Sequence, residues 1–235
     1  MNTILFDLDG TLLPMNTDVF MEIYFKEIKA YFNEFTDGDI FIQNLLSSTK
    51  AILENTETKT NKEVFMCDFS NRISEDLEFY NEKFDSFYDS AFLKTKASIF
   101  DNKLVPEMIK ILKEKGYTLA IATNPLFPLK AILHRINWAK LDPNDFMYIS
   151  SYEKNCFTKP SLNFYKEILN DLHKSPKECL MVGNDVQEDL IASELGIKTY
   201  LIENHIINRD TSEIKFDYKG NYEDFYNFVK NLPYL

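Results

Sequence analysis

The first apolar stretch of the chain is short and ends in charge. Residues Ile4 to Phe6 are apolar and β-favouring, and Gly10 follows closely, which predicts a buried strand rather than the start of a helix. Asp7 and Asp9 stand at the end of this strand. Because side chains two apart on an extended backbone point the same way, the two carboxylates converge and repel unless a cation or a proton lies between them.

A long helical pattern follows, from residue 15 to about residue 98. It contains one glycine, Gly38, and no proline, and its apolar residues recur at helical spacing. The recurring positions are Phe20, Tyr24, Ile28, Tyr31 and Phe35, and then Val64, Phe69, Ile73, Leu77, Tyr80, Phe84 and Phe87. We interpret the aromatic residues among them as packing between helices rather than as a substrate pocket.

After residue 98 the pattern changes to helices alternating with strands. Helices are predicted at 106–115, 129–136, 160–172 and up to residue 195, and strands in TLAIAT, FMYIS, CLMVG and KTYLI. Such alternation predicts a parallel sheet with both faces covered. We therefore predict an α/β protein with a Rossmann-like core, residues 1–14 and 99–235, and an all-helical domain, residues 15–98, inserted after the first strand.

Polar residues stand at the carboxyl ends of the predicted strands, where ligands bind in open α/β sheets. Besides Asp7 and Asp9, they are Thr123 at the end of TLAIAT with Asn124 after it, and Asn184, Asp185 and Asp189 after CLMVG. Lys159, just before the helix at 160–172, is the only cation that the pattern places to join them. The topology thus predicts an acidic cluster, a hydroxyl group and a lysine at one edge of the sheet.

This cluster has the chemistry of a magnesium and phosphate site. Carboxylates with oxygen-only partners suit Mg²⁺, which prefers octahedral oxygen ligation and keeps several waters. A carboxylate can also attack phosphorus and form an aspartyl phosphate, provided that a metal ion and a lysine screen the approach of two anions. We therefore expect Mg²⁺ to neutralise the aspartates after the first strand.

Four segments, in order, resemble the motifs of the haloacid dehalogenase-like (HAD) hydrolase superfamily. They are DLDGTL at 7–12, Thr123 in IATNP, Lys159 in TKP and GNDVQED at 183–189. The resemblance covers nearly the whole chain, because the helical block lies where that superfamily places a cap after its first motif.

The resemblance implies a role for each site residue. Asp7 is expected to be the nucleophile, and Asp9 the general acid that protonates the leaving oxygen and then activates water. Thr123 is expected to bind the transferring phosphoryl group, and Lys159 to hold nucleophile and phosphate against their repulsion. The residues implied are catalytic Asp7, Asp9, Thr123 and Lys159, substrate-binding Thr123, Asn124, Lys159 and Gly10, metal-binding Asp7, Asp9, Asn184 and Asp185, and supporting Asp189.

The last motif departs from the usual pattern of the superfamily. Where many members have an aspartate directly after the glycine, this chain has Asn184, followed by Asp185. An amide oxygen can ligate Mg²⁺ but removes one negative charge, so both residues stay candidates for the metal. Asp185 and Asp189 could instead favour the N-terminus of the following helix through its dipole.

The predicted function is a Mg²⁺-dependent phosphatase that hydrolyses a small phosphorylated metabolite through an aspartyl phosphate. A phosphomutase of the same superfamily stays open, as does a catalytically weak binding or regulatory protein on the same fold, to which Asn184 lends weight. A dehalogenase is disfavoured, because it lacks the second aspartate of the first motif, and Asp9 is present here.

Composition and charge argue against some classes of binding partner. The net charge is −11, the isoelectric point is near 4.8 and no run of lysine or arginine occurs, which argues against nucleic acids and anionic membranes. Cys67, Cys156 and Cys179 are odd in number and widely spaced, as in reduced structural thiols. With no signal-peptide pattern and no apolar run long enough to span a bilayer, we expect a cytoplasmic monomer or small homo-oligomer.

Overall fold

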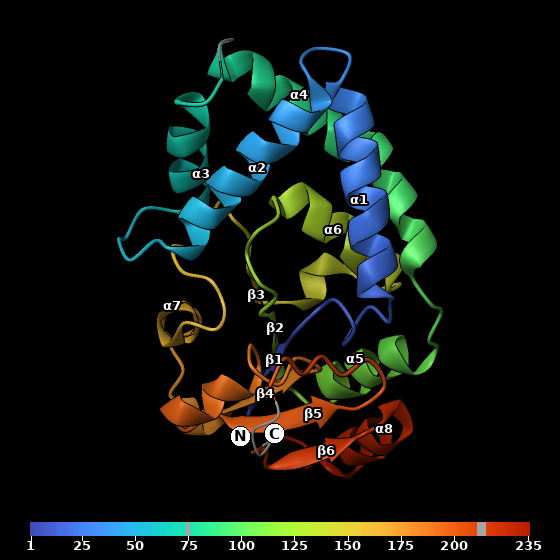
Figure 1. The fold of residues 1–235 in the computed structure, drawn as a ribbon. Coiled ribbons are helices and arrows are strands. Elements are labelled where there is room, and N and C mark those ends of the chain that lie inside the picture. The colour runs from blue at the N-terminus through green and yellow to red at the C-terminus, as the bar shows by residue number, and fades with distance from the viewer. Residues whose placement is uncertain (74–75, 211–214) are drawn as a thin grey trace.

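The computed structural model describes residues 1–73, 76–210 and 215–235, and its strands form a single parallel sheet in the order β3-β2-β1-β4-β5-β6 (Figure 1). The strands are β1 (Thr3–Phe6), β2 (Thr118–Ile121), β3 (Tyr148–Ile149), β4 (Cys179–Gly183), β5 (Lys198–Ile202) and β6 (Tyr218–Gly220). At the end of β1, Phe6 pairs with Ile121 on one side and with Val182 on the other. The carboxyl ends of β1, β2 and β4 therefore lie next to one another.

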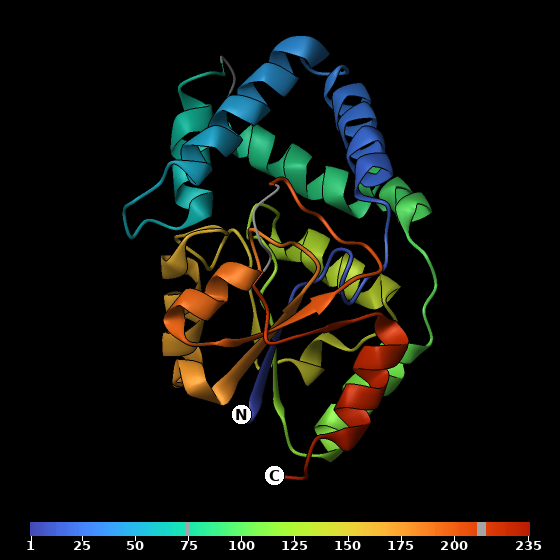
Figure 2. The ribbon, with the colours of Figure 1, turned by 60° about the horizontal axis from the view of Figure 1, so that its bottom comes forward.

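Helices cover both faces of the sheet. They are α5 (Leu104–Glu114), α6 (Leu129–Trp138), α7 (Leu162–Leu172) and α8 (Tyr222–Asn231), joined by the 3₁₀ turns η2 (Pro143–Asp145), η3 (Pro176–Glu178) and η4 (Leu190–Leu195). Alternate residues of β1 face opposite sides: Phe6 packs in the cluster that contains α5, α6 and α8, whereas Leu5 packs with α7. Figure 2 shows α5 and α8 side by side on one face. The predicted fold class is confirmed.

The block between β1 and α5 is helical, as predicted, and lies above the sheet (Figures 1 and 2). It consists of α1 (Thr17–Phe32), α2 (Gly38–Leu53), α3 (Asn61–Ser70), α4 (Leu77–Asp89) and the 3₁₀ segment η1 (Ala91–Ser98). Its interior is aromatic: the rings of Phe32 and Phe41 stack with centroids 3.9 Å apart, and Tyr24 contacts Phe87 edge-on. We call these helices the cap.

The cap contacts the sheet domain at several places, among them its entry and exit segments, the start of α3, and α4, where Asp85 and Asp89 pair with Lys130 of α6. Where the chain enters and leaves the cap, the two segments pair, since the Asn16 amide donates to the Ser98 carbonyl oxygen at 2.9 Å and the Phe100 amide to that of Pro14 at 2.8 Å. At the start of α3, the Asn61 amide donates to the carbonyl oxygen of Asn155 at 2.8 Å. The predicted domain boundaries, 14/15 and 98/99, fall within the paired entry and exit segments, and we keep that division as a proposal.

Several predicted elements differ from those observed. The amphipathic stretch from Val64 to Phe87 is divided between two helices, α3 and α4. The helix expected up to residue 195 is only the short 3₁₀ turn η4. The turn before η4 is fixed by side-chain to backbone bonds, because the Asp185 carboxylate accepts from the amides of Gln187 and Glu188 at 3.0 and 2.9 Å. Such bonds compete with the i to i−4 pattern of an α-helix. Strand β6 and helix α8 were not predicted.

All three cysteines are free, with Cys67 exposed, Cys156 half-buried and Cys179 buried. Among the helices of the described ranges, none is both long and apolar enough to cross a bilayer.

Candidate active site

The loop after β1 is held in place by contacts from two distant segments. Gly10 has a φ of +85°, and a Cβ atom there would lie 2.4 Å from the side-chain nitrogen of Asn184, so both the backbone and the space require glycine. The Thr11 hydroxyl donates to the Asn184 amide oxygen at 2.8 Å. The Tyr222 hydroxyl from α8 contacts the carbonyl oxygens of Gly10 and Thr11 at 3.0 and 2.9 Å. The loop that follows Asp7 is therefore held by the segments of Asn184 and Tyr222.

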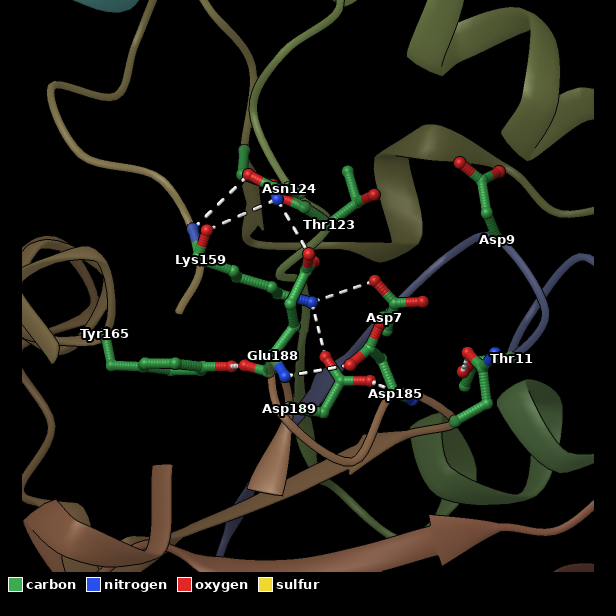
Figure 3. A network of polar contacts seen from close by, with 12 residues as sticks. Asp7, Asp9, Thr11, Thr123, Asn124, Lys159, Tyr165, Asp185, Glu188 and Asp189 are labelled. Atoms are coloured by element: carbon green, nitrogen blue, oxygen red, sulfur yellow. Dashed lines mark hydrogen bonds and ion pairs between the residues drawn. The ribbon is translucent and has the colours of Figure 1, made fainter. Parts of the chain in front are cut away.

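Lys159 lies between two carboxylates at the end of the sheet (Figure 3). Its side chain is 1% exposed, and its ammonium contacts Asp7 Oδ1 at 2.8 Å and Asp189 Oδ1 at 2.6 Å. Burial by itself lowers the pKa of Lys159, but the charges of Asp189 and Asp7 outweigh it and hold that pKa well above its usual range. The lysine thus stays charged and donates a hydrogen bond to one oxygen of Asp7.

Asp189 is fully buried and faces away from solvent. Its second oxygen, Oδ2, accepts from the Asp185 amide at 2.9 Å, so each of its oxygens has a donor. It therefore contacts both Lys159 and the turn after β4, and its supporting role in the reaction stays a prediction.

Thr123 and Asn124 follow β2 and reach the same edge of the sheet. Thr123 is buried, and its carbonyl oxygen accepts from the Ser150 hydroxyl at 2.6 Å, which fixes the strand end. The Asn124 side chain accepts from the Lys159 amide at 3.3 Å and donates to the Glu188 carboxylate at 3.1 Å. Figure 3 shows both residues above the Lys159 and Asp7 side chains.

Asn184 and Asp185 use their side chains differently. The side-chain nitrogen of Asn184 donates to the His205 carbonyl oxygen at 2.6 Å, and its side-chain oxygen accepts from the Thr11 hydroxyl. The side chain therefore links the loop after β1 to the loop after β5. The Asp185 carboxylate pairs with the Arg209 guanidinium, with Nη1 at 2.6 Å from Oδ2. Of these two residues, Asp185 therefore carries the negative charge, while Asn184 is neutral and links two loops.

Asp9 pairs with Arg135, a residue that lies outside the four motifs. Arg135 lies on α6, its side chain is 1% exposed, and its Nη1 donates to Asp9 Oδ2. The rings of Phe127 and Phe20 lie 4.7 and 5.8 Å from the guanidinium carbon. The remaining atoms, Asp9 Oδ1 and Arg135 Nη2, are buried without a hydrogen-bond partner among the described residues.

The position of Asp9 affects its chemistry. Burial raises the pKa of the Asp9 carboxyl, against the opposing effect of the Arg135 charge. Figure 3 shows the Asp9 side chain directed away from Asp7, so the two carboxylates do not converge as the strand spacing predicted. The reason is that Gly10 turns the backbone directly after Asp9 and Arg135 holds the side chain toward α6.

The structure thus corrects the prediction that Lys159 is the only cation at the site, because Arg135 and Arg209 also pair with its carboxylates. A signal for Arg135 was present in the sequence: it lies on the apolar face of its helix, next to Ile132 and Ile136. No comparable signal marks Arg209, which lies in a loop after β5. Glu188 and Tyr222 were missed in the same way.

A pocket of about 150 Å³ opens at this edge of the sheet, and it brings most of the predicted residues together. Its walls include Asp7, Asp9, Thr123, Asn124, Asn184 and Asp185. Thr17 from the cap helix α1 and Arg209 complete the rim. Lys159 and Asp189 are buried behind Asp7, and the backbone of Gly10 lies against Asn184.

The donor atoms of this pocket fit a hard cation such as Mg²⁺. Lys159 takes only Oδ1 of Asp7, and no hydrogen-bond donor among the described residues takes Oδ2 of this partly exposed carboxylate. Asp185 contributes a second carboxylate and Asn184 an amide oxygen. Within the described ranges, no group of three or more His, Cys, Asp or Glu side chains could hold a metal ion alone. Mg²⁺ commonly keeps several waters, which would complete a shell begun by these oxygens.

Comparison with known proteins identifies a family that matches most of the chain. A family model described as haloacid dehalogenase-like hydrolase matches residues 1–200. The chain is 28% identical to the pyrophosphatase PpaX of Anoxybacillus flavithermus over 205 residues, which cover 84% of this chain and 81% of that protein.

Solved structures show the same fold at lower identity. A HAD phosphatase from Thermococcus onnurineus is 18% identical with a TM-score of 0.61, over the full length of both chains. A 2-haloacid dehalogenase from Pseudomonas syringae pv. Tomato is 15% identical with a TM-score of 0.65, over 98% of each chain. Since the fold hosts both kinds of enzyme, the reaction has to be inferred from the residues of the site.

Proposed function

The chain belongs to the haloacid dehalogenase-like hydrolases, and on that premise we propose that it is a Mg²⁺-dependent phosphatase of small phosphorylated metabolites. The observation that carries the proposal is the environment of Asp7. One of its oxygens is held by the buried ammonium of Lys159, and the residue lines the pocket at the carboxyl end of the sheet. A carboxylate presented in this way is suited to attack phosphorus.

In the proposed reaction, Asp7 attacks the phosphoryl group and forms an aspartyl phosphate, which water then hydrolyses. Lys159 keeps its charge throughout and offsets the repulsion between Asp7 and the phosphate. Thr123, at the end of β2, is within the pocket wall to bind a phosphoryl oxygen. Mg²⁺, held by Asp7, Asp185 and oxygens such as that of Asn184, would supply further positive charge at the phosphoryl oxygens.

Asp9 is the proposed general acid and base. A carboxyl whose pKa is raised by burial retains its proton at higher pH than an exposed one, which suits the protonation of a leaving oxygen. The same group, once deprotonated, can accept a proton from the water that attacks the aspartyl phosphate. Its side chain faces Arg135 here, so this role requires it to turn toward Asp7.

The site residues also help to choose among the alternative functions. Asp9 disfavours a dehalogenase, which lacks this aspartate. A phosphomutase retains Asp9 and stays an alternative, as does a binding protein without turnover. The resemblance to PpaX supports a phosphorylated substrate and adds inorganic pyrophosphate to the candidates. The free thiols support the proposed cytoplasmic setting.

Phosphate release from a panel of phosphorylated compounds, with Mg²⁺ and with excess chelator, tests the proposal. Pyrophosphate, sugar phosphates and 4-nitrophenyl phosphate should include substrates, and hydrolysis should need no bisphosphate activator, which a mutase would require. The matched control is Asp7→Asn, which is nearly isosteric but a poor nucleophile. It should lack turnover, with a melting temperature equal to or above that of the wild type. More than a tenth of wild-type activity in Asp7→Asn would contradict the nucleophile, and Mg²⁺ binding without turnover would favour a binding protein.

A further inference from the structure

Arg209 lies at the rim of the catalytic pocket, in the loop after β5 and outside the four motifs. Its Nη1 contacts both oxygens of Asp185, and its Nη2 lies 3.6 Å from Glu188. The side chain is 53% exposed, so part of the guanidinium is open to a ligand. The contact with Glu188 is long and half-exposed, and such ion pairs contribute little stability.

The charge of Arg209 matters because the pocket is otherwise acidic. Lys159 and Arg135 are each 1% exposed and already paired with carboxylates. Among the described residues that line the pocket, Arg209 is the one cation. Its other charged walls are carboxylates, among them Asp185 and Glu188, which repel an anionic substrate.

Space for a second group lies beside Arg209. A hollow of about 540 Å³ shares Thr17, Ile207 and Arg209 with the catalytic pocket and extends toward the segments that enter and leave the cap. On its far wall the rings of Phe100 and His205 stack with centroids 5.8 Å apart. A substrate bound at Asp7 can therefore extend past Arg209 into this hollow.

We propose that Arg209 selects the substrate class by binding a second anionic group, so that preferred substrates carry a phosphate or carboxylate near the phosphoryl group. The planar guanidinium offers paired N–H donors that match either group, and a bond between two charged partners is stronger than a neutral one. This inference rests on the proposed phosphatase function. It assigns specificity to a loop of the sheet domain rather than to the cap.

The test compares Arg209→Met with the wild-type protein on pyrophosphate and on 4-nitrophenyl phosphate, which has no second anionic group. With Mg²⁺ present, kcat/KM for pyrophosphate should fall by about 10- to 100-fold, mainly through KM, the loss expected when a charged hydrogen-bond donor is removed. The loss should be at least about tenfold smaller for 4-nitrophenyl phosphate. Arg209→Lys should recover part of the pyrophosphate activity. Arg72→Met, at an exposed arginine of the cap that pairs with Asp68, is the matched control and should change neither value.

A binding measurement separates this inference from the proposed function. In the Asp7→Asn background, calorimetry with methylenediphosphonate and with methylphosphonate reports recognition without turnover. Arg209→Met should weaken the bisphosphonate much more than the monophosphonate. Equal losses for both ligands and both substrates would overturn the inference and leave Arg209 as a positioning residue for Asp185, and no loss would overturn it outright. Absence of turnover on every substrate would instead remove the proposed function, while the binding comparison would still test Arg209.

Discussion

Replacement of Arg135 by methionine tests the buried ion pair beneath the cap. The substitution keeps an apolar side chain between Phe20 and Phe127 but removes the charge that faces Asp9. Arg135 is 1% exposed, whereas the Asp9 side chain is 26% exposed. Removing one partner of a buried pair typically costs 3–5 kcal/mol, because the other charge stays buried and unpaired. Since Asp9 retains some contact with water, we expect a loss of about 3 kcal/mol, at the lower end of that range.

Urea unfolding and thermal melting measure this loss. For a chain of this size about 3 kcal/mol corresponds to a melting temperature lower by about 6–12 °C. The loss should shrink as the pH falls, because a protonated Asp9 leaves no buried charge. In a double-mutant cycle, Asp9→Asn together with Arg135→Met should recover part of the loss, since neither charge remains. The exposed pair of Arg72 and Asp68 provides the control, where Arg72→Met should cost less than about 1 kcal/mol. A loss below about 1 kcal/mol at Arg135, or strict additivity in the cycle, would refute the reasoning.

Three further predictions concern the catalytic acid, the metal and a turn remote from both. Asp9→Asn should slow hydrolysis of alkyl phosphates far more than of aryl phosphates, whose phenolate leaves unaided, because general acid catalysis contributes about 10²- to 10⁴-fold; equal losses in steady-state assays would remove Asp9 from this role. Asp185→Asn should weaken Mg²⁺ binding in a calorimetric titration, and an unchanged Mg²⁺ affinity would contradict the assignment of Asp185 as a ligand. Asn184→Asp should keep the Mg²⁺ affinity but lower the melting temperature, because it places a carboxylate oxygen against the His205 carbonyl oxygen. Hydrogen bonds from the backbone and hydroxyl of Ser175 lower the pKa of Glu178 to about 2 in the folded protein. The ionised Glu178 therefore stabilises the fold at a pH above its unfolded pKa, near 4.5, and this stabilisation is lost as the pH falls toward 2. Between pH 5 and pH 2, Glu178→Gln should therefore lose less stability than the wild type in urea titrations, and parallel losses would contradict this.

The local pattern was sufficient for most of the architecture. The buried strand at 4–6, the run CLMVG and the amphipathic spacing in α1 depend on side chains within one element, whose period of two or of nearly four residues decides which face is buried. The parallel order follows from alternation with helices. Where local side-chain bonds replace helical ones, as in the turn after β4, the pattern predicted an α-helix that does not form.

The candidate site divides in the same way. Asp7, Thr123, Lys159 and Asp189 each follow or precede a predicted element, so the topology of the sheet was enough to place them at one edge. The four motifs, taken together, identified the family to which the chain belongs. The roles of these residues stay predictions until the variants are measured.

Only the tertiary structure shows which charged side chains of the site form ion pairs with each other. Asp9 contacts Arg135, 126 residues away, and Asp185 contacts Arg209 across 24 residues and a strand. Neither pair has a sequence spacing that predicts contact, because the distance between two loops is determined by strand order and helix packing rather than by chain separation. The side chain of Asp9 shows the consequence. Strand periodicity predicted that it points toward Asp7, but β1 ends at Phe6, the backbone turns at Gly10, and the side chain pairs with the buried guanidinium on α6.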